Sequence, residues 1–164
     1  MDAPEGCPAL KPTRGRILAT PPSEVRRLHA LPLRLSPGCD LRREIEQAVA
    51  ALPSQSGFVL SGIGSLTRAN LRFAAAESPT SLVEALEVLS LGGSITPAGA
   101  HLHASLSTAS GAVLGGHLGY GCVVRTTAEI LIAVLPEWRL SREHDPATGY
   151  QELTIARRLD SDVA

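Results

Sequence analysis

Three of the five histidines of this 164-residue chain lie close together in the sequence, at positions 101, 103 and 117. Residues two apart in an extended strand project from the same face, so His101 and His103 would point the same way. Neutral imidazole is a good ligand for zinc, and three such nitrogens leave one coordination position open for water or substrate. The spacing predicts a site for zinc or another divalent metal at His101, His103 and His117.

The position of His117 depends on the register of a predicted hairpin. The polar stretch Thr108-Ala109-Ser110-Gly111 is typical of a turn, because glycine readily adopts positive φ. If Ser107 paired with Ala112, His117 would point to the wrong face. A shift of one residue brings His117 opposite His103, so that all three rings share a face. This shift needs an odd-length loop or a one-residue bulge.

Other readings of these residues remain open. The three histidines could instead satisfy a polar sheet face or a contact between subunits. Glu129 is a weak candidate for a catalytic group, because it could hydrogen-bond a ligand imidazole or act as a base beside a metal. It could equally be a polar residue at a sheet edge or subunit interface, and Glu87 has the same ambiguity. His29 and His144 have no such neighbours and are interpreted as surface residues.

The elements that must position the histidines are mostly short strands. Asp40 is a good N-cap for a helix with a buried stripe, and Pro53 marks the end of that helix. Two glycine-rich segments, Gly62-Ile63-Gly64-Ser65 and Gly92-Gly93, are interpreted as turns. The pattern predicts an α+β fold, a mainly antiparallel sheet with one clear helix. The expected strands are 31–35, 58–61, 70–73, 84–91, the two histidine strands, 122–135, 138–142 and 150–155.

Length and composition indicate one compact domain. Hydrophobic residues make up 44% of the chain and charged residues 19%, which is ordinary for a globular protein. We expect a mobile, proline-rich arm at 1–24, a domain at 25–156 and a tail at 157–164. The longest apolar run, Ile130–Leu135, is too short to cross a membrane, and no signal-peptide pattern is present.

The cysteines and the charge limit the classes of function. The three cysteines (Cys7, Cys39 and Cys122) are widely spaced, which suits free thiols in a reducing, cytoplasmic setting. A net charge of −1 and 3% aromatic residues argue against nucleic-acid binding through global electrostatics or base stacking. A local basic patch is still conceivable near the N-terminus, or those charges are simply solvated; the arginines concerned are Arg26, Arg27, Arg34, Arg42 and Arg43.

Several separated motifs occur in an order that resembles the PPC (plant and prokaryote conserved) domain family. They span about residues 26 to 155, and their number and order make the resemblance specific. The matching segments are Pro37–Leu41, Ser61–Leu66, Leu86–Gly93, His101–His103, Gly115–Leu118, Ala128–Glu129 and Asp145–Gly149.

The resemblance implies a PPC-domain-like fold, with a largely antiparallel sheet, assembled as a homotrimer. In plants the domain follows AT-hooks and mediates self-association and contacts with transcription factors. Stand-alone prokaryotic members lack the hook, and here Arg14-Gly15-Arg16 lacks the proline that a hook requires. In some prokaryotic members the histidine motif is associated with a metal taken to be zinc, which points again to His101, His103 and His117.

Some positions depart from the family pattern. Cys39 replaces the acidic residue usual before the helix-opening Asp40, and Thr108 replaces the common acidic turn residue. The stretch Glu84–Leu89 keeps Glu87 but lacks the arginine and aromatic residue of the plant proteins. These departures affect recognition of plant-type partners and leave the histidines untouched.

Two functional hypotheses follow. The first is a trimeric regulatory or DNA-associated binding protein that carries the three-histidine metal site and has duplex DNA or a regulatory protein as partner. The alternative is a zinc-dependent enzyme, such as a hydrolase. Zinc held by three imidazoles can lower the pKa of its water to about 7 and supply a nucleophile.

Overall fold

The computed structural model describes residues 29–158, which form one helix and nine strands. The predicted arm at 1–24 therefore lies outside the described residues, as does most of the predicted tail. In chain order the elements are β1 (His29–Leu35), α1 (Leu41–Ala50), β2 (Gly57–Arg72), β3 (Thr80–Leu82), β4 (Leu86–Thr96), β5 (Gly99–Thr108), β6 (Val113–Leu118), β7 (Val123–Val134), β8 (Trp138–Asp145) and β9 (Tyr150–Arg157).

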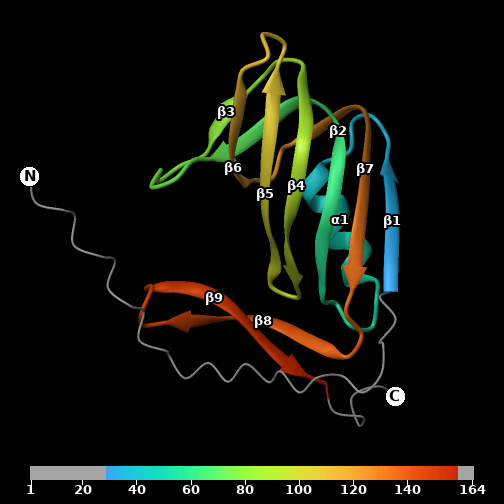
Figure 1. Cartoon of the computed structure of the whole chain (residues 1–164), viewed down its shortest axis with the longest axis vertical. Coiled ribbons are helices and arrows are strands. Elements are labelled where there is room, and N and C mark those ends of the chain that lie inside the picture. Colours follow the sequence, from blue (N-terminus) through green and yellow to red (C-terminus); the bar gives the residue numbers. More distant parts are fainter. Residues whose placement is uncertain (1–28, 159–164) are drawn as a thin grey trace, which may run out of the picture.

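The main sheet is antiparallel throughout and has the strand order β1-β7-β2-β4-β5-β6, with β3 paired to β2. β2 pairs with β4 along its length and with β6 at its end, so β2, β4, β5 and β6 close a circuit of paired strands. β8 and β9 form a separate hairpin that runs across one end of the sheet (Figure 1). The described residues confirm the predicted antiparallel sheet with one helix.

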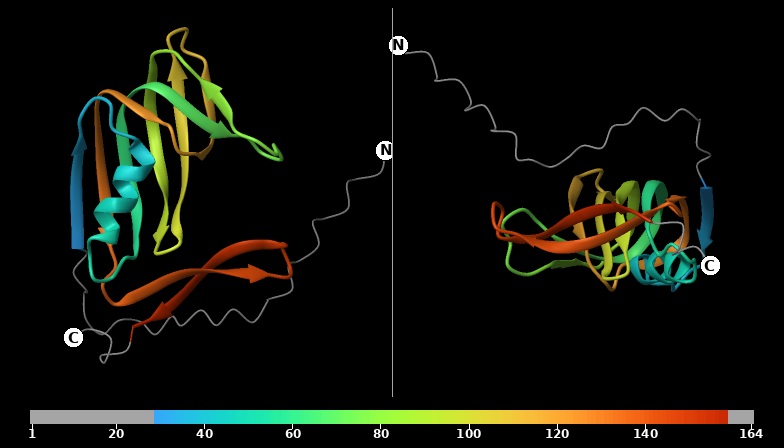
Figure 2. Two further views of the ribbon diagram at one scale, coloured as in Figure 1. Left: turned by 180° about the vertical axis from the view of Figure 1, so that it is seen from behind. Right: turned by 90° about the horizontal axis from the view of Figure 1, so that it is seen from below.

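Helix α1 covers one face of the sheet (Figure 2). Asp40 caps it as the sequence predicts, since its Oδ1 accepts hydrogen bonds from the backbone N–H groups of Arg42 and Arg43, both at 3.1 Å. Leu41, Ile45 and Val49 are buried against the inner sides of the strands. No helix of the described part is long and apolar enough to span a membrane.

The prediction that two glycine-rich segments form turns is wrong. Gly62–Ser65 lies inside β2, and Gly92-Gly93 lies inside β4. Gly64 is needed within β2 because backbones approach closely: a Cβ there would lie 2.4 Å from the carbonyl oxygen of Thr127. The two short strands expected at 58–61 and 70–73 are consequently one 16-residue strand. The short strand β3 was not predicted.

Gly93 shows the same constraint most strongly. Its φ is +145°, and an added Cβ would lie 2.0 Å from the carbonyl oxygen of His101 on the neighbouring strand. The adjacent Gly92 has no such restriction, because the nearest atom to an added Cβ is 3.8 Å away. Gly93, and not Gly92, therefore allows β4 and β5 to approach next to the histidines.

Substituting Gly93→Ala should lower the free energy of unfolding by about 2 kcal/mol or more, because it adds backbone strain and a collision with β5. Gly92→Ala is the matched control and should change stability little. Both are measured by urea denaturation followed by circular dichroism. Equal stability of the two variants would show that the close approach at Gly93 is unimportant.

Candidate metal centre

The register of the β5–β6 hairpin brings the third histidine into place. Ser107 pairs with Val113, and His103 pairs directly with His117. The segment between the last paired residues is 108–112, an odd-length loop, in which Gly111 has φ +82°. The required shift of one residue therefore comes from the loop length, and the β5–β6 pairing contains no bulge.

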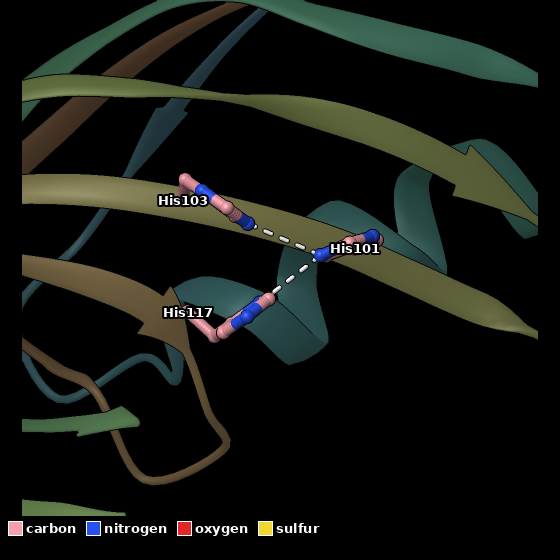
Figure 3. Close-up of side chains that lie close together, drawn as sticks. All are labelled: His101, His103 and His117. Carbon is pink, nitrogen blue, oxygen red and sulfur yellow. Dashed lines mark hydrogen bonds between the residues drawn. The ribbon is translucent and has the colours of Figure 1, made fainter. Parts of the chain in front are cut away.

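The three rings meet on the face of the sheet away from the core (Figure 3). His101 Nε2 lies 3.0 Å from His117 Nδ1 and 3.1 Å from His103 Nε2. One potential ligand nitrogen from each ring falls within 4.8 Å of the others. The structure thus brings together all three residues that the sequence predicts as metal ligands.

Hydrogen bonds among the three rings cannot account for both of the close nitrogen contacts of His101. A neutral imidazole nitrogen carries either one proton or one lone pair, so His101 Nε2 can make only one full hydrogen bond, although two ring nitrogens lie within reach. A cation would accept lone pairs from all three rings. Tetrahedral zinc with bonds of about 2.0–2.1 Å places its nitrogen ligands about 3.3 Å apart. The donor set fits a divalent ion and leaves a fourth coordination position.

Close packing of the backbone holds His117 beside the other rings. β6 lies between β5 and the end of β2, where His117 also pairs with Arg72. A Cβ at Gly116 would lie 2.6 Å from the carbonyl oxygen of Arg72, and one at Gly115 would lie 3.0 Å from that of Ala104. The two glycines before His117 therefore permit strand pairing on both sides.

The surroundings of His101 and His117 favour the neutral form of these two rings. Burial lowers the pKa of His101 below its ordinary value of 6.5; Arg142 and the other two rings lower it further, and Glu152 opposes them. Burial likewise lowers the pKa of His117, with smaller effects from His103 and Arg72. A metal ligand must be neutral imidazole, so both shifts favour ligation near neutral pH.

A groove of about 790 Å³ lies beside the histidines. His101 and His103 line one part of it, and Arg142, Glu152 and Leu153 of the β8–β9 hairpin line another. No local motif in the sequence marks Arg142 as a residue of this site. Its position depends on how the hairpin lies against the sheet.

The other predicted residues lie apart from this centre. Glu129 of β7 and Glu87 of β4 line a different groove, of about 380 Å³, and do not line the groove of the histidines. His29, at the start of β1, and His144, on β8, are exposed, as the sequence predicts. Cys39 and Cys122 are free thiols.

The proposed basic patch is not a simple set of free cations. Arg26 and Arg27 lie outside the described residues. Arg42 pairs with Glu46 at 3.0 Å and donates to the carbonyl oxygens of Leu118 and Ala100 at 3.1 and 2.6 Å. Arg42 therefore joins α1 to β5 and β6. The remaining members of the patch, Arg34 and Arg43, are exposed.

The sheet, the helix and the histidine cluster together define the class. The model of the Plants and Prokaryotes Conserved (PCC) domain matches residues 22–136, and the chain therefore belongs to this family. It is the family named PPC above, whose motifs the sequence resembles. Among curated relatives, the bifunctional protein GlmU of Synechococcus sp. (strain JA-2-3B'a(2-13)) is 52% identical over 128 residues. The match covers 78% of this chain but 20% of that protein, so the chain spans about a fifth of its relative.

Solved structures share the fold. A hypothetical protein from Salmonella cholerae-suis is 38% identical, with a TM-score of 0.79 over 83% of this chain and 99% of that one. A metal-containing protein from Archaeoglobus fulgidus is 27% identical, with a TM-score of 0.66 over 80% and 99%. A protein from Bacteroides thetaiotaomicron, named provisionally for DNA binding, is 21% identical with a TM-score of 0.68 over 76% and 91%, which shows the fold alone.

In metal-free protein, His101 and His117 should titrate with midpoints below 6.5, because burial and the neighbouring cations disfavour their charged forms. The unfolded chain then binds protons before the folded chain does. Stability should accordingly be full above pH 6.5 and decrease as the pH falls below it. Histidine ring signals in NMR spectra give the midpoints. A midpoint at or above 6.5 for either residue would contradict the prediction.

Proposed function

We propose that this PCC-domain protein is a homotrimer that binds one divalent metal ion per chain, preferably zinc, and works as a regulatory or DNA-associated binding module. The observation that carries the proposal is the convergence of three imidazole nitrogens around His101 Nε2. The metal-containing relative from Archaeoglobus fulgidus supports the metal.

The metal would join two strands. His101 and His103 belong to β5 and His117 to β6, so an ion held by all three would tie the two strands of the hairpin together. Binding of a ligand to the folded state alone stabilises that state. A site of this kind can serve as a structural element or as a sensor of metal supply.

Self-association is supported by apolar side chains on the outer face of the sheet. Leu60 and Ile63 of β2, Leu89 of β4 and Leu131 of β7 are 52%, 54%, 51% and 38% exposed. Their strands are neighbours in the sheet. Such a cluster of exposed apolar residues is typical of an interface with another protein surface. The family resemblance implies that this surface belongs to further copies of the chain, in a trimer.

A zinc-dependent enzyme is the second candidate function. The groove beside the histidines favours it, because it offers space for a substrate next to the fourth coordination position. A bound zinc ion would act there as a Lewis acid. Glu129, the weak candidate for a base, lines the other groove. The binding module comes first, because Glu129 does not line the groove of the histidines; the carboxylate that does so is Glu152.

Elemental mass spectrometry of protein purified without a histidine tag should find close to one metal ion per chain. The triple variant His101→Ala/His103→Ala/His117→Ala should lose it, because it lacks all three nitrogens. The double variant His29→Ala/His144→Ala is the matched control and should keep it. Absence of metal from the wild type after incubation with zinc would overturn the metal site.

Light scattering should give a mass of three chains at micromolar concentration. Adding a duplex oligonucleotide at low ionic strength should increase that mass, and the increase should decline as salt is added, since phosphate contacts release counterions. A single-chain mass would contradict the trimer. No increase with the duplex, or one insensitive to salt, would overturn direct DNA binding.

A further inference from the structure

Arg142 reaches from the β8–β9 hairpin to the strand beside the histidines. Its Nη2 donates a hydrogen bond of 2.7 Å to Oγ of Ser94, which is buried. Ser94 is the direct cross-strand partner of His101 in the β4–β5 pairing. The guanidinium group therefore lies next to the metal centre, although it is 25 residues further along the chain than His117.

The positive charge of Arg142 has no carboxylate partner among residues 29–158. The hydrogen bond of Arg142 goes to a neutral hydroxyl, and the ion pair between Arg42 and Glu46 does not involve it. Glu152 also lines the groove, with a negative charge. A divalent ion on the histidines, Arg142 and Glu152 together would give the groove a net charge of about +2. Such a groove attracts anions.

The floor of the groove is left open by a glycine that the backbone does not require. Gly92 pairs with His103 and lines the groove between Ser90 and Ser94. Its φ is not positive, and an added Cβ would meet nothing closer than 3.8 Å. The missing side chain therefore creates space beside the metal centre rather than meeting a need of the fold.

We propose that this groove binds a small anionic molecule, a carboxylate or a phosphate ester, between the metal position and Arg142. One oxygen of the anion would face the fourth coordination position, and a second charged oxygen would accept hydrogen bonds from the guanidinium group. Guanidinium matches the geometry of both kinds of anion. Ser90 and Ser105, which also line the groove, offer hydroxyl donors. This inference rests on the proposed metal site and specifies the class of ligand that would bind beside the metal.

The test uses the full chain loaded with cobalt(II), whose visible absorption reports changes at the metal. Malonate and phenyl phosphate are titrated separately, with malonamide as a neutral control. We expect saturable spectral changes with at least one anion and none with malonamide. Arg142→Gln should weaken anion binding by about ten- to a hundredfold, because a charged hydrogen-bonding partner is lost. Arg139→Gln is the matched control, since Arg139 lies on the same strand, is exposed and does not line the groove.

A second variant addresses the risk that Arg142→Gln displaces the hairpin. Gly92→Leu fills the groove from β4 instead of from the hairpin. It should weaken binding of the same anion without reducing the metal content. Wild-type protein that binds cobalt but neither anion would overturn this inference and leave the proposed metal site intact. Equal affinities in Arg142→Gln and Arg139→Gln would also overturn it. Failure to bind cobalt or zinc would overturn the proposed metal site together with the inference, and metal analysis distinguishes these cases.

Discussion

The pairing of His103 with His117 is the constraint on which the centre depends. Side chains alternate along a strand, so a hairpin loop shorter or longer by one residue would turn His117 to the core side of the sheet. The loop at 108–112 has the length that keeps all three rings on one face. Because β6 pairs on its other side with the end of β2, the register is held from both directions. The convergence of the three rings is thus a consequence of strand register.

Glycines make the close pairing of β4 with β5 and of β6 with β2 sterically feasible. Gly93 lets β4 meet the backbone of β5 at His101, and Gly116 lets β6 meet the backbone of β2 at Arg72. Each removes a Cβ that would otherwise hold two strands apart. The resulting circuit of β2, β4, β5 and β6 positions the histidines before any ion binds. Under the proposed function, a metal ion would require little further ordering of these strands, which would favour its affinity.

Local patterns in the sequence predict the elements next to the site, and they do not predict contacts between distant elements. The helix after Asp40 and the three histidines follow from spacing and capping chemistry, whereas the sequence leaves open whether an odd-length loop or a bulge sets the register of the hairpin. Gly62–Ser65 and Gly92-Gly93 have the composition of turns, but crowding by the backbones of neighbouring strands makes Gly64 necessary within β2 and Gly93 within β4. No local pattern identifies Arg142, because its proximity to His101 depends on where the hairpin lies on the sheet. The family motifs do identify the fold, since they preserve the order of these elements.

The electrostatics of the cluster connect the fold to a preference among ligands. Burial lowers the pKa of His101 and His117, and the charge of Arg142 adds to this effect at His101. The positive charge of Arg142 would also repel a metal ion and weaken its binding. An anion between the ion and the guanidinium group removes this conflict, because it is attracted by both. Metal and anion should therefore bind cooperatively, each increasing the affinity for the other by the same factor. If both proposals hold, this reciprocity would make the groove and the histidines one functional unit, in which Arg142 links metal binding to the presence of a small anionic ligand.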